Sequence, residues 1–177
     1  MRTSAAMSKK GSERVAWKEC SSAGVISGSL VCGPIVQSWE LNDTTPLEAT
    51  KDEAGNSYYS TGDREVTGKI VFLQRDKDTL LLGETYRDKY VTAVKEMTAT
   101  ALNGVYQYAV IPIMQFQPDI KIAAPAESQE VPIKVQVCST AVAVDLTSYT
   151  GFQIALTCAA FTIPSGSYFG IYTQASS

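Results

Sequence analysis

The sequence predicts a mainly β fold: an antiparallel β-sandwich or barrel of about nine strands with one short helix. Val, Ile and Thr together make up 43 of the 177 residues, and these β-branched residues favour strands. Short segments in which apolar and polar residues alternate follow one another along the chain. Turn-forming residues such as Asn103-Gly104 separate these segments. The length suits one domain with a core of its own.

The chain is expected to consist of a basic N-terminal arm over residues 1–14, followed by a single domain over 15–177. Glycines and other small residues in 24–33 indicate a strand with bends or a loop. Residues 35–41 alternate, which predicts a strand with Ile35 and Trp39 on one face and Val36 on the other.

Residues 47–60 are predicted to form a protruding hairpin with an acidic tip. The segments 47–51 and 57–60 have strand character, and Asp-Glu-Ala-Gly-Asn at 52–56 is rich in turn-forming residues.

A long strand and a short helix are expected next. Residues 65–75 place Val66, Ile70 and Phe72 on one side. Asp76 or Asp78 is suited to accept hydrogen bonds from the first N–H groups of a short helix, which Gly83 is expected to end.

Residues 89–102 fit two structures. Tyr86, Tyr90 and Val94 have helical spacing, whereas the β-branched residues of 90–94 favour a strand. The Asn103-Gly104 pair favours the strand, because it is a strong signal for a two-residue hairpin and a strand-like segment follows it.

The rest of the chain is predicted as a proline-containing loop and further strands. The loop covers residues 118–130, and residues 139–177 form a C-terminal extension of strands. One strand is predicted before the extension, over 131–137. Three are predicted within it, over 141–146, 152–162 and 168–173.

Charge is distributed unevenly. No charged residue occurs in 103–117, and Asp145 is the only one in 135–177, whereas 40–65 contains seven acidic and two basic residues. A charge-free strand is either buried on both faces of its sheet or covered by neighbouring copies, because interface cores contain few charges. The alternation of Ser and Thr with apolar residues favours neighbouring copies.

The composition argues against an enzyme. The chain has no histidine, which excludes Ser-His-Asp and Cys-His nucleophiles and histidine-ligated metals. The four cysteines are widely spaced, so we expect no metal site, no cofactor, and buried free thiols in a reducing compartment. The polar, basic start is not expected to be a signal peptide, and no segment is apolar enough to span a membrane.

The order of parts over about residues 35–138 resembles the tail tube proteins of bacteriophages and their relatives in contractile injection systems. The resemblance is carried by the acidic turn at 52–56, Tyr58-Tyr59, the strand 65–75 leading into Asp76-Lys77-Asp78-Thr79-Leu80-Leu81, the Asn103-Gly104 hairpin and the loop before 131–137. The extension 139–177 is longer than in a minimal tube subunit.

The resemblance implies a virion structural protein that forms rings, often hexameric, which stack into a tube for DNA. Its partners would be copies of itself and other virion proteins, with DNA only passing through the lumen, no membrane involved, and assembly in the host cytoplasm. The subunit-interface candidates are Arg2, Lys9, Lys10, Arg14, Leu47, Tyr58, Tyr59, Tyr106, Tyr108, Phe152, Phe161 and Tyr168. The candidates for an acidic lumen are Glu48, Asp52 and Glu53.

Three alternatives stay open. The chain could decorate a capsid or connect head and tail, because the C-terminal extension exceeds the tube pattern. It could be a β-sandwich that binds carbohydrate through stacked tyrosines such as Tyr58 and Tyr59. An enzyme without histidine, using the acids of 40–65, is the third.

Overall fold

The computed structural model describes residues 13–33, 35–72, 77–98, 101–118 and 128–176. Over these residues the chain is mainly β, with twelve strands, two four-residue α-helices and one 3-10 helix. All pairings between the strands are antiparallel. The predicted fold class, an antiparallel β-sandwich, is therefore confirmed, with more strands and one more α-helix than expected.

The main sheet contains eight strands. Seven of them follow the order β2-β1-β7-β8-β9-β6-β3, and β12 pairs with the first half of β8. The Val36 N–H donates to the Glu13 carbonyl at 2.8 Å, so the sheet curls until β3 meets the residues before β1. The strands are β1 (Val15–Cys20), β2 (Val31–Cys32), β3 (Val36–Thr44), β6 (Glu65–Phe72), β7 (Tyr90–Glu96), β8 (Val105–Phe116), β9 (Gln129–Val135) and β12 (Gly170–Ala175).

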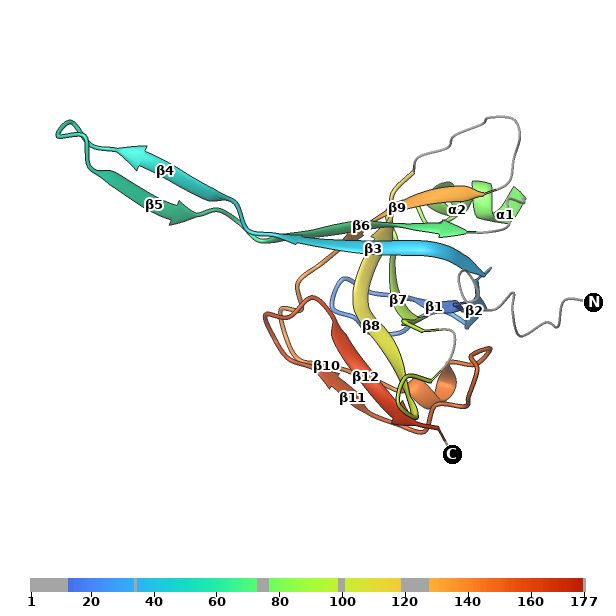
Figure 1. The fold of residues 1–177 in the computed structure, drawn as a ribbon. Helices are drawn as coiled ribbons and strands as arrows, with labels where there is room; N and C mark the ends of the chain where they lie inside the picture. The colour runs from blue at the N-terminus through green and yellow to red at the C-terminus, as the bar shows by residue number, and fades with distance from the viewer. Residues whose placement is uncertain (1–12, 34, 73–76, 99–100, 119–127, 177) are drawn as a thin grey trace, which may run out of the picture.

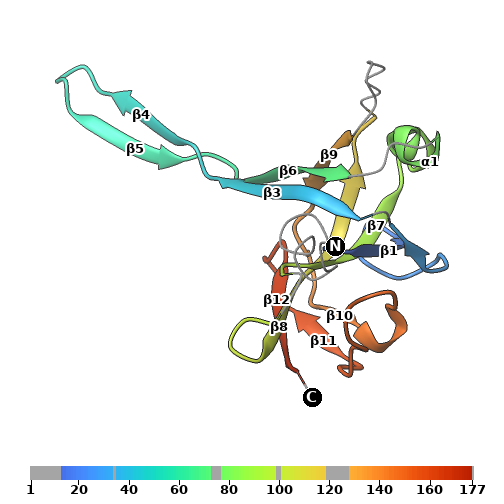
Figure 2. The same ribbon diagram turned by 45° about the vertical axis from the view of Figure 1, so that its right-hand side comes forward.

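Two smaller pairs complete the β-structure. The strands β10 (Val142–Val144) and β11 (Phe161–Ile163) form a layer beside the main sheet, and β4 (Leu47–Lys51) pairs with β5 (Ser57–Thr61) as a hairpin. Figure 1 shows this hairpin extending far from the body as a continuation of β3 and β6. The same projection is seen after a turn of 45° (Figure 2).

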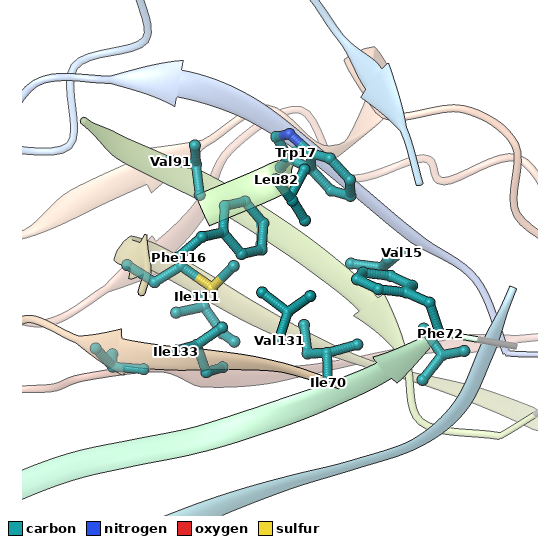
Figure 3. Close-up of a cluster of buried hydrophobic side chains, with 14 of the residues drawn as sticks. Val15, Trp17, Ile70, Phe72, Leu82, Val91, Ile111, Phe116, Val131 and Ile133 are labelled. Atoms are coloured by element: carbon teal, nitrogen blue, oxygen red, sulfur yellow. The ribbon is translucent and has the colours of Figure 1, made fainter. Parts of the chain in front are cut away.

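Two hydrophobic core clusters lie on opposite faces of β8. Ile111, Met114 and Phe116 belong to the first cluster, inside the curled sheet (Figure 3). Tyr108 and Val110 belong to the second, which also contains residues of β10 and β11. Because β8 is buried on both faces, its lack of charge needs no neighbouring subunit, and burial explains it.

The faces predicted for β3 are wrong. The strand has a register shift between Val36 and Ser38, which is a β-bulge. The extra residue turns the following side chains over, so that Trp39 packs against the same core cluster as the fully buried Val36. The faces predicted for β6 are confirmed, with Val66, Ile70 and Phe72 all buried.

Helical structure occurs where the single short helix was expected, but the expectation that Gly83 ends it is wrong. Two short helices, α1 (Lys77–Leu80) and α2 (Leu82–Thr85), replace the single one, and Asp78 lies inside α1 while Asp76 falls outside the described residues. Gly83 is buried inside α2. A Cβ atom there would lie 2.5 Å from the Gln117 carbonyl oxygen, so the glycine serves close packing instead of ending a helix.

The strand prediction for 89–102 is confirmed for β7. Leu102 and Val105 exchange both backbone hydrogen bonds around Asn103-Gly104, at 2.9 and 3.0 Å. Both central residues have positive φ, 51° and 76°, as a type I′ turn requires.

The strand predicted over 141–146 is shorter than expected, the one predicted over 168–173 is shifted by two residues with its length unchanged, and the strand expected over 152–162 is wrong except at its end. Residues 151–160 follow an irregular path before β11. Side chains from elsewhere bind this backbone: a Glu96 carboxylate oxygen accepts from the Gln153 N–H at 2.7 Å, and Gln174 accepts from the Thr157 N–H at 3.0 Å. These two N–H groups are thus satisfied without a neighbouring strand.

Candidate assembly interface

The described residues contain no group of acidic residues, cysteines or histidines that could hold a metal ion. Their cysteines are all free thiols, with Cys20 and Cys138 buried and Cys158 partly buried. The expectation of buried thiols is wrong for Cys32, which is exposed. In the described part of the chain, no helix is long and apolar enough to cross a bilayer.

The hairpin β4–β5 is exposed along its length. Every side chain from Leu47 to Tyr59 is exposed. Direct pairing of Ala49 with Tyr59 and of Thr50 with Tyr58 assigns these side chains to opposite faces. We call the face of Leu47, Ala49 and Tyr59, which also carries Lys51 next to the tip, the apolar face, and that of Glu48, Thr50 and Tyr58 the acidic face.

Both faces carry large side chains into solvent. Leu47 and Tyr59 are 69% and 70% exposed, and Tyr58 on the acidic face is 59% exposed. Two paired strands are marginally stable alone in water and need a further packing partner. No described residue covers either face, so the hairpin is a candidate interface.

Asp52 organises the tip of the hairpin. One of its carboxylate oxygens accepts from the N–H groups of Ala54 and Asn56, both at 2.9 Å. The other accepts from the Asn56 side-chain amide at 3.0 Å and the Tyr58 hydroxyl at 3.2 Å. These hydrogen bonds, first of all those from Asn56, lower the pKa of Asp52. Asp52 therefore stabilises the turn. Glu48 and Glu53 contribute negative charge to the surface of the hairpin.

At the root of the hairpin, Arg64 contacts two other parts of the chain. Its guanidinium group forms a forked ion pair with Asp43, in which Nε donates to the carboxylate at 2.7 Å and an amino nitrogen donates to the second oxygen. It also lies 4.8 Å from the ring centroid of Tyr168, whose hydroxyl donates to the Arg64 carbonyl at 2.8 Å. Tyr168, an interface candidate, thus makes internal contacts here.

The C-terminal layer presents a surface without charge. In β10, Val142 and Val144 point into the second core cluster and Ala143 points out. Ala143 pairs with Thr162 of β11, whose side chain is also exposed. Along β12 the exposed positions are Ile171, Thr173 and Ala175. These five exposed residues lie on two separate sheets that both contribute to the second core cluster, and we call them together the neutral surface.

The other interface candidates have different positions. Tyr108 is fully buried in the second core cluster, so its candidacy as an interface residue is wrong. Burial raises the pKa of its hydroxyl, which has no hydrogen-bond partner. Partly buried positions beside that cluster hold Tyr106, Phe152 and Phe161. Arg2, Lys9 and Lys10 lie outside the described residues, and Arg14, which directly precedes β1, is partly buried.

Sequence reasoning missed a buried pair of charged residues at the end of β7. Lys95 and Glu96 are both almost fully buried. Burial lowers the pKa of Lys95 from 10.5 to about 8, and its ammonium group lies 5.0 Å from the Trp39 ring. Burial also raises the pKa of Glu96.

The Glu96 side chain joins distant parts of the chain. Its carboxylate accepts from the Arg14 N–H at 3.0 Å and from the Gln153 N–H at 2.7 Å. It therefore connects the start of the first strand to the irregular C-terminal segment. Charged residues on a predicted strand are normally assigned to its solvent face, so no local signal identifies this role.

Comparison with known proteins brings no relative to this description. No family model and no curated protein sequence matches the chain.

Proposed function

We propose that the protein is a virion structural subunit that assembles with copies of itself into stacked rings forming the tube of a bacteriophage tail. A hexameric ring is the favoured form, and the lumen would let the genomic DNA pass without binding it. The chain would act through its surfaces alone, with no catalysis, cofactor or metal. Its place would be the virion tail, after assembly in the host cytoplasm.

The projecting hairpin is the observation that supports this proposal most. It exposes Leu47 and Tyr59 on one face, where burial against a second subunit would stabilise the contact by roughly 1.5–3 kcal/mol for each side chain. The ribbon extends far beyond the body (Figure 1), and so it is suited to reach a neighbouring subunit. Other virion proteins would contact the same surfaces at the tube ends.

The distribution of charge supports the same proposal. The neutral surface has the low charge of an interface core, which suits contact between subunits. The hairpin carries Glu48, Asp52 and Glu53 against the single Lys51. Acidic groups that face a lumen would repel the phosphate backbone of passing DNA.

Assembly of the purified protein tests the proposal. Negative-stain microscopy and sedimentation velocity of the wild type should show rings or tubes. The double variant Leu47→Ser/Tyr59→Ser should sediment as a folded monomer, because its hairpin lacks the apolar contact. Leu102→Ser is the matched control, since Leu102 is a similarly exposed side chain on a turn of the body, and it should assemble as the wild type does.

The opposing results are equally clear. A wild-type protein that stays monomeric at high concentration and in every salt tested would reject self-assembly. A monomer that binds carbohydrate and loses this binding on replacement of Tyr58 and Tyr59 by Ala would instead establish the binding module.

A further inference from the structure

The ribbon that joins the hairpin to the body has a joint in it. The pairing of β3 with β6 ends at Thr44 opposite Glu65, and the pairing of β4 with β5 begins at Leu47 opposite Thr61. Between these pairs, two residues on one strand face three on the other. This mismatch is the geometry of a bulge, which bends a ribbon and increases its twist.

A single backbone hydrogen bond crosses the described joint. The Gly62 N–H donates to the Pro46 carbonyl at 2.8 Å. Pro46 has no N–H to return a bond. The direction of the hairpin therefore depends on side chains near the joint as well as on its backbone.

Arg64 is the residue that supplies these contacts. It is the last of the three residues on the longer side of the joint. Its forked ion pair crosses the ribbon to Asp43, the next-to-last residue of β3. A planar guanidinium group that binds both carboxylate oxygens fixes an orientation, which a point charge does not.

Tyr168 extends the same contacts to the C-terminal part of the chain. It lies just before β12 and packs against the first core cluster. Its ring lies against the Arg64 guanidinium group, and its hydroxyl donates to the Arg64 carbonyl. One side chain thus holds both the backbone and the head group of Arg64.

We propose that Arg64, held between Asp43 and Tyr168, is a latch that fixes the direction of the hairpin relative to the body. Release of the latch leaves the hairpin free to turn about the Pro46–Gly62 joint. Each contact is partly exposed and weak alone, so a partner that moves Tyr168 removes both of its contacts with Arg64 and leaves Arg64 with the ion pair to Asp43 alone. The C-terminal segment that carries Tyr168 continues into β12 and its part of the neutral surface, so that occupation of this surface is coupled to hairpin direction. The latch is a property of the single subunit and does not depend on the proposed function.

Distance measurement between spin labels tests the latch. The parent protein carries Cys32→Ser and Cys158→Ser, with labels at Thr50→Cys on the hairpin and Ala143→Cys on β10, and is studied at a concentration where it is monomeric. Double electron–electron resonance on this parent should give one narrow distance distribution. Arg64→Ala should broaden that distribution at least twofold, with an unchanged near-ultraviolet circular dichroism spectrum.

Further variants separate the latch from general loosening. Tyr168→Phe keeps the ring and loses the hydroxyl, and it should broaden the distribution less than Arg64→Ala does. Asp43→Asn removes one charge without changing the shape, which gives a second test if Arg64→Ala fails to fold. Arg87→Ala is the matched control, because Arg87 makes a similar exposed ion pair with Glu84 far from the joint. It should leave the distribution narrow.

Two results would overturn the proposal. The first is a distribution in Arg64→Ala, or in Asp43→Asn if only that variant folds, as narrow as in the parent. The second is equal broadening by Arg87→Ala. If Tyr168→Phe has no effect while Arg64→Ala broadens the distribution, the link to the C-terminal segment is overturned.

Discussion

Two parts of the chain lack charge for different reasons. Residues 103–117 mostly form β8, which is buried on both faces between the two core clusters. Residues 137–176 contain only Asp145, yet much of this region is exposed, including Ala143, Thr162 and Thr173. The same compositional signal therefore marks the inside of the subunit in one place and an uncovered surface in the other.

The difference shows how charge depletion should be interpreted. In β8 the residues from Tyr108 to Met114 are consecutively buried, as in a strand with a core on each side. In β10 and β12 buried or half-buried positions alternate with exposed ones, and the exposed ones are uncharged, with Ile171 the large apolar side chain among them. Alternation without charge is thus the pattern of an exposed, uncharged strand face, and consecutive burial is that of a core strand.

The largest effect is expected from placing a carboxylate in each region. Ile111→Asp puts an unpaired charge into the first core cluster and should cost about 4 kcal/mol or more of the free energy of unfolding. Ala143→Asp, on the neutral surface, should change it by less than about 0.5 kcal/mol. Urea denaturation followed by circular dichroism measures both. Equal losses in the two variants would erase the distinction between the regions.

Glu96 connects the two regions, because it pairs with Tyr108 of β8 and its carboxylate binds the Gln153 N–H. Its substitution tests this connection. Glu96→Ala leaves the N–H groups of Arg14 and Gln153 without their acceptor, which should cost about 2 kcal/mol or more, at roughly 1–3 kcal/mol for each unsatisfied donor. Hydrogen exchange should accelerate at Gln153. Glu84→Ala, at an exposed position, is the control, and unchanged exchange in Glu96→Ala would show that the carboxylate does not hold the segment.

Lys95 pairs with Ala109 of β8. Its burial beside that strand can be tested by the pH dependence of the free energy of unfolding. Its pKa in the folded state is lowered to about 8, so that between pH 8 and its ordinary value of 10.5 the unfolded chain binds more protons. Stability should therefore rise with pH in this range. From pH 7.5 to 9.5 this contribution amounts to about 2 kcal/mol.

The comparison of variants isolates that contribution from the other groups that titrate in this range. The stability of Lys95→Met relative to the wild type should fall by this amount between pH 7.5 and 9.5. Lys89→Met, at an exposed lysine, should follow the wild type. A constant difference between Lys95→Met and wild type would show that Lys95 is not buried as described.

Sequence patterns captured the parts of the fold that depend on local signals. The hairpin with its 52–56 turn, the Asn103-Gly104 turn and the buried side of β6 each follow from neighbouring residues. The bulge after Val36 and the burial of Tyr108 depend on contacts between distant strands.

In the candidate interface, too, local features can be predicted from the sequence and long-range contacts cannot. Leu47 and Tyr59 stand out because they lie on a hairpin that is otherwise polar. The role of Arg64 depends on Tyr168, 104 residues further along the chain. The irregular course of 151–160 depends on acceptors from Glu96 and Gln174. Such pairings leave no periodic signal in the sequence.

Sedimentation velocity of the wild type beside Ala143→Asp and Leu47→Ser/Tyr59→Ser tests the account most directly, because it asks whether these surfaces join copies of the chain. The wild type should form a discrete oligomer or tubes, and both variants should remain folded and shift to the monomer. A wild-type protein that is monomeric throughout, or variants that assemble as fully as the wild type, would contradict the account.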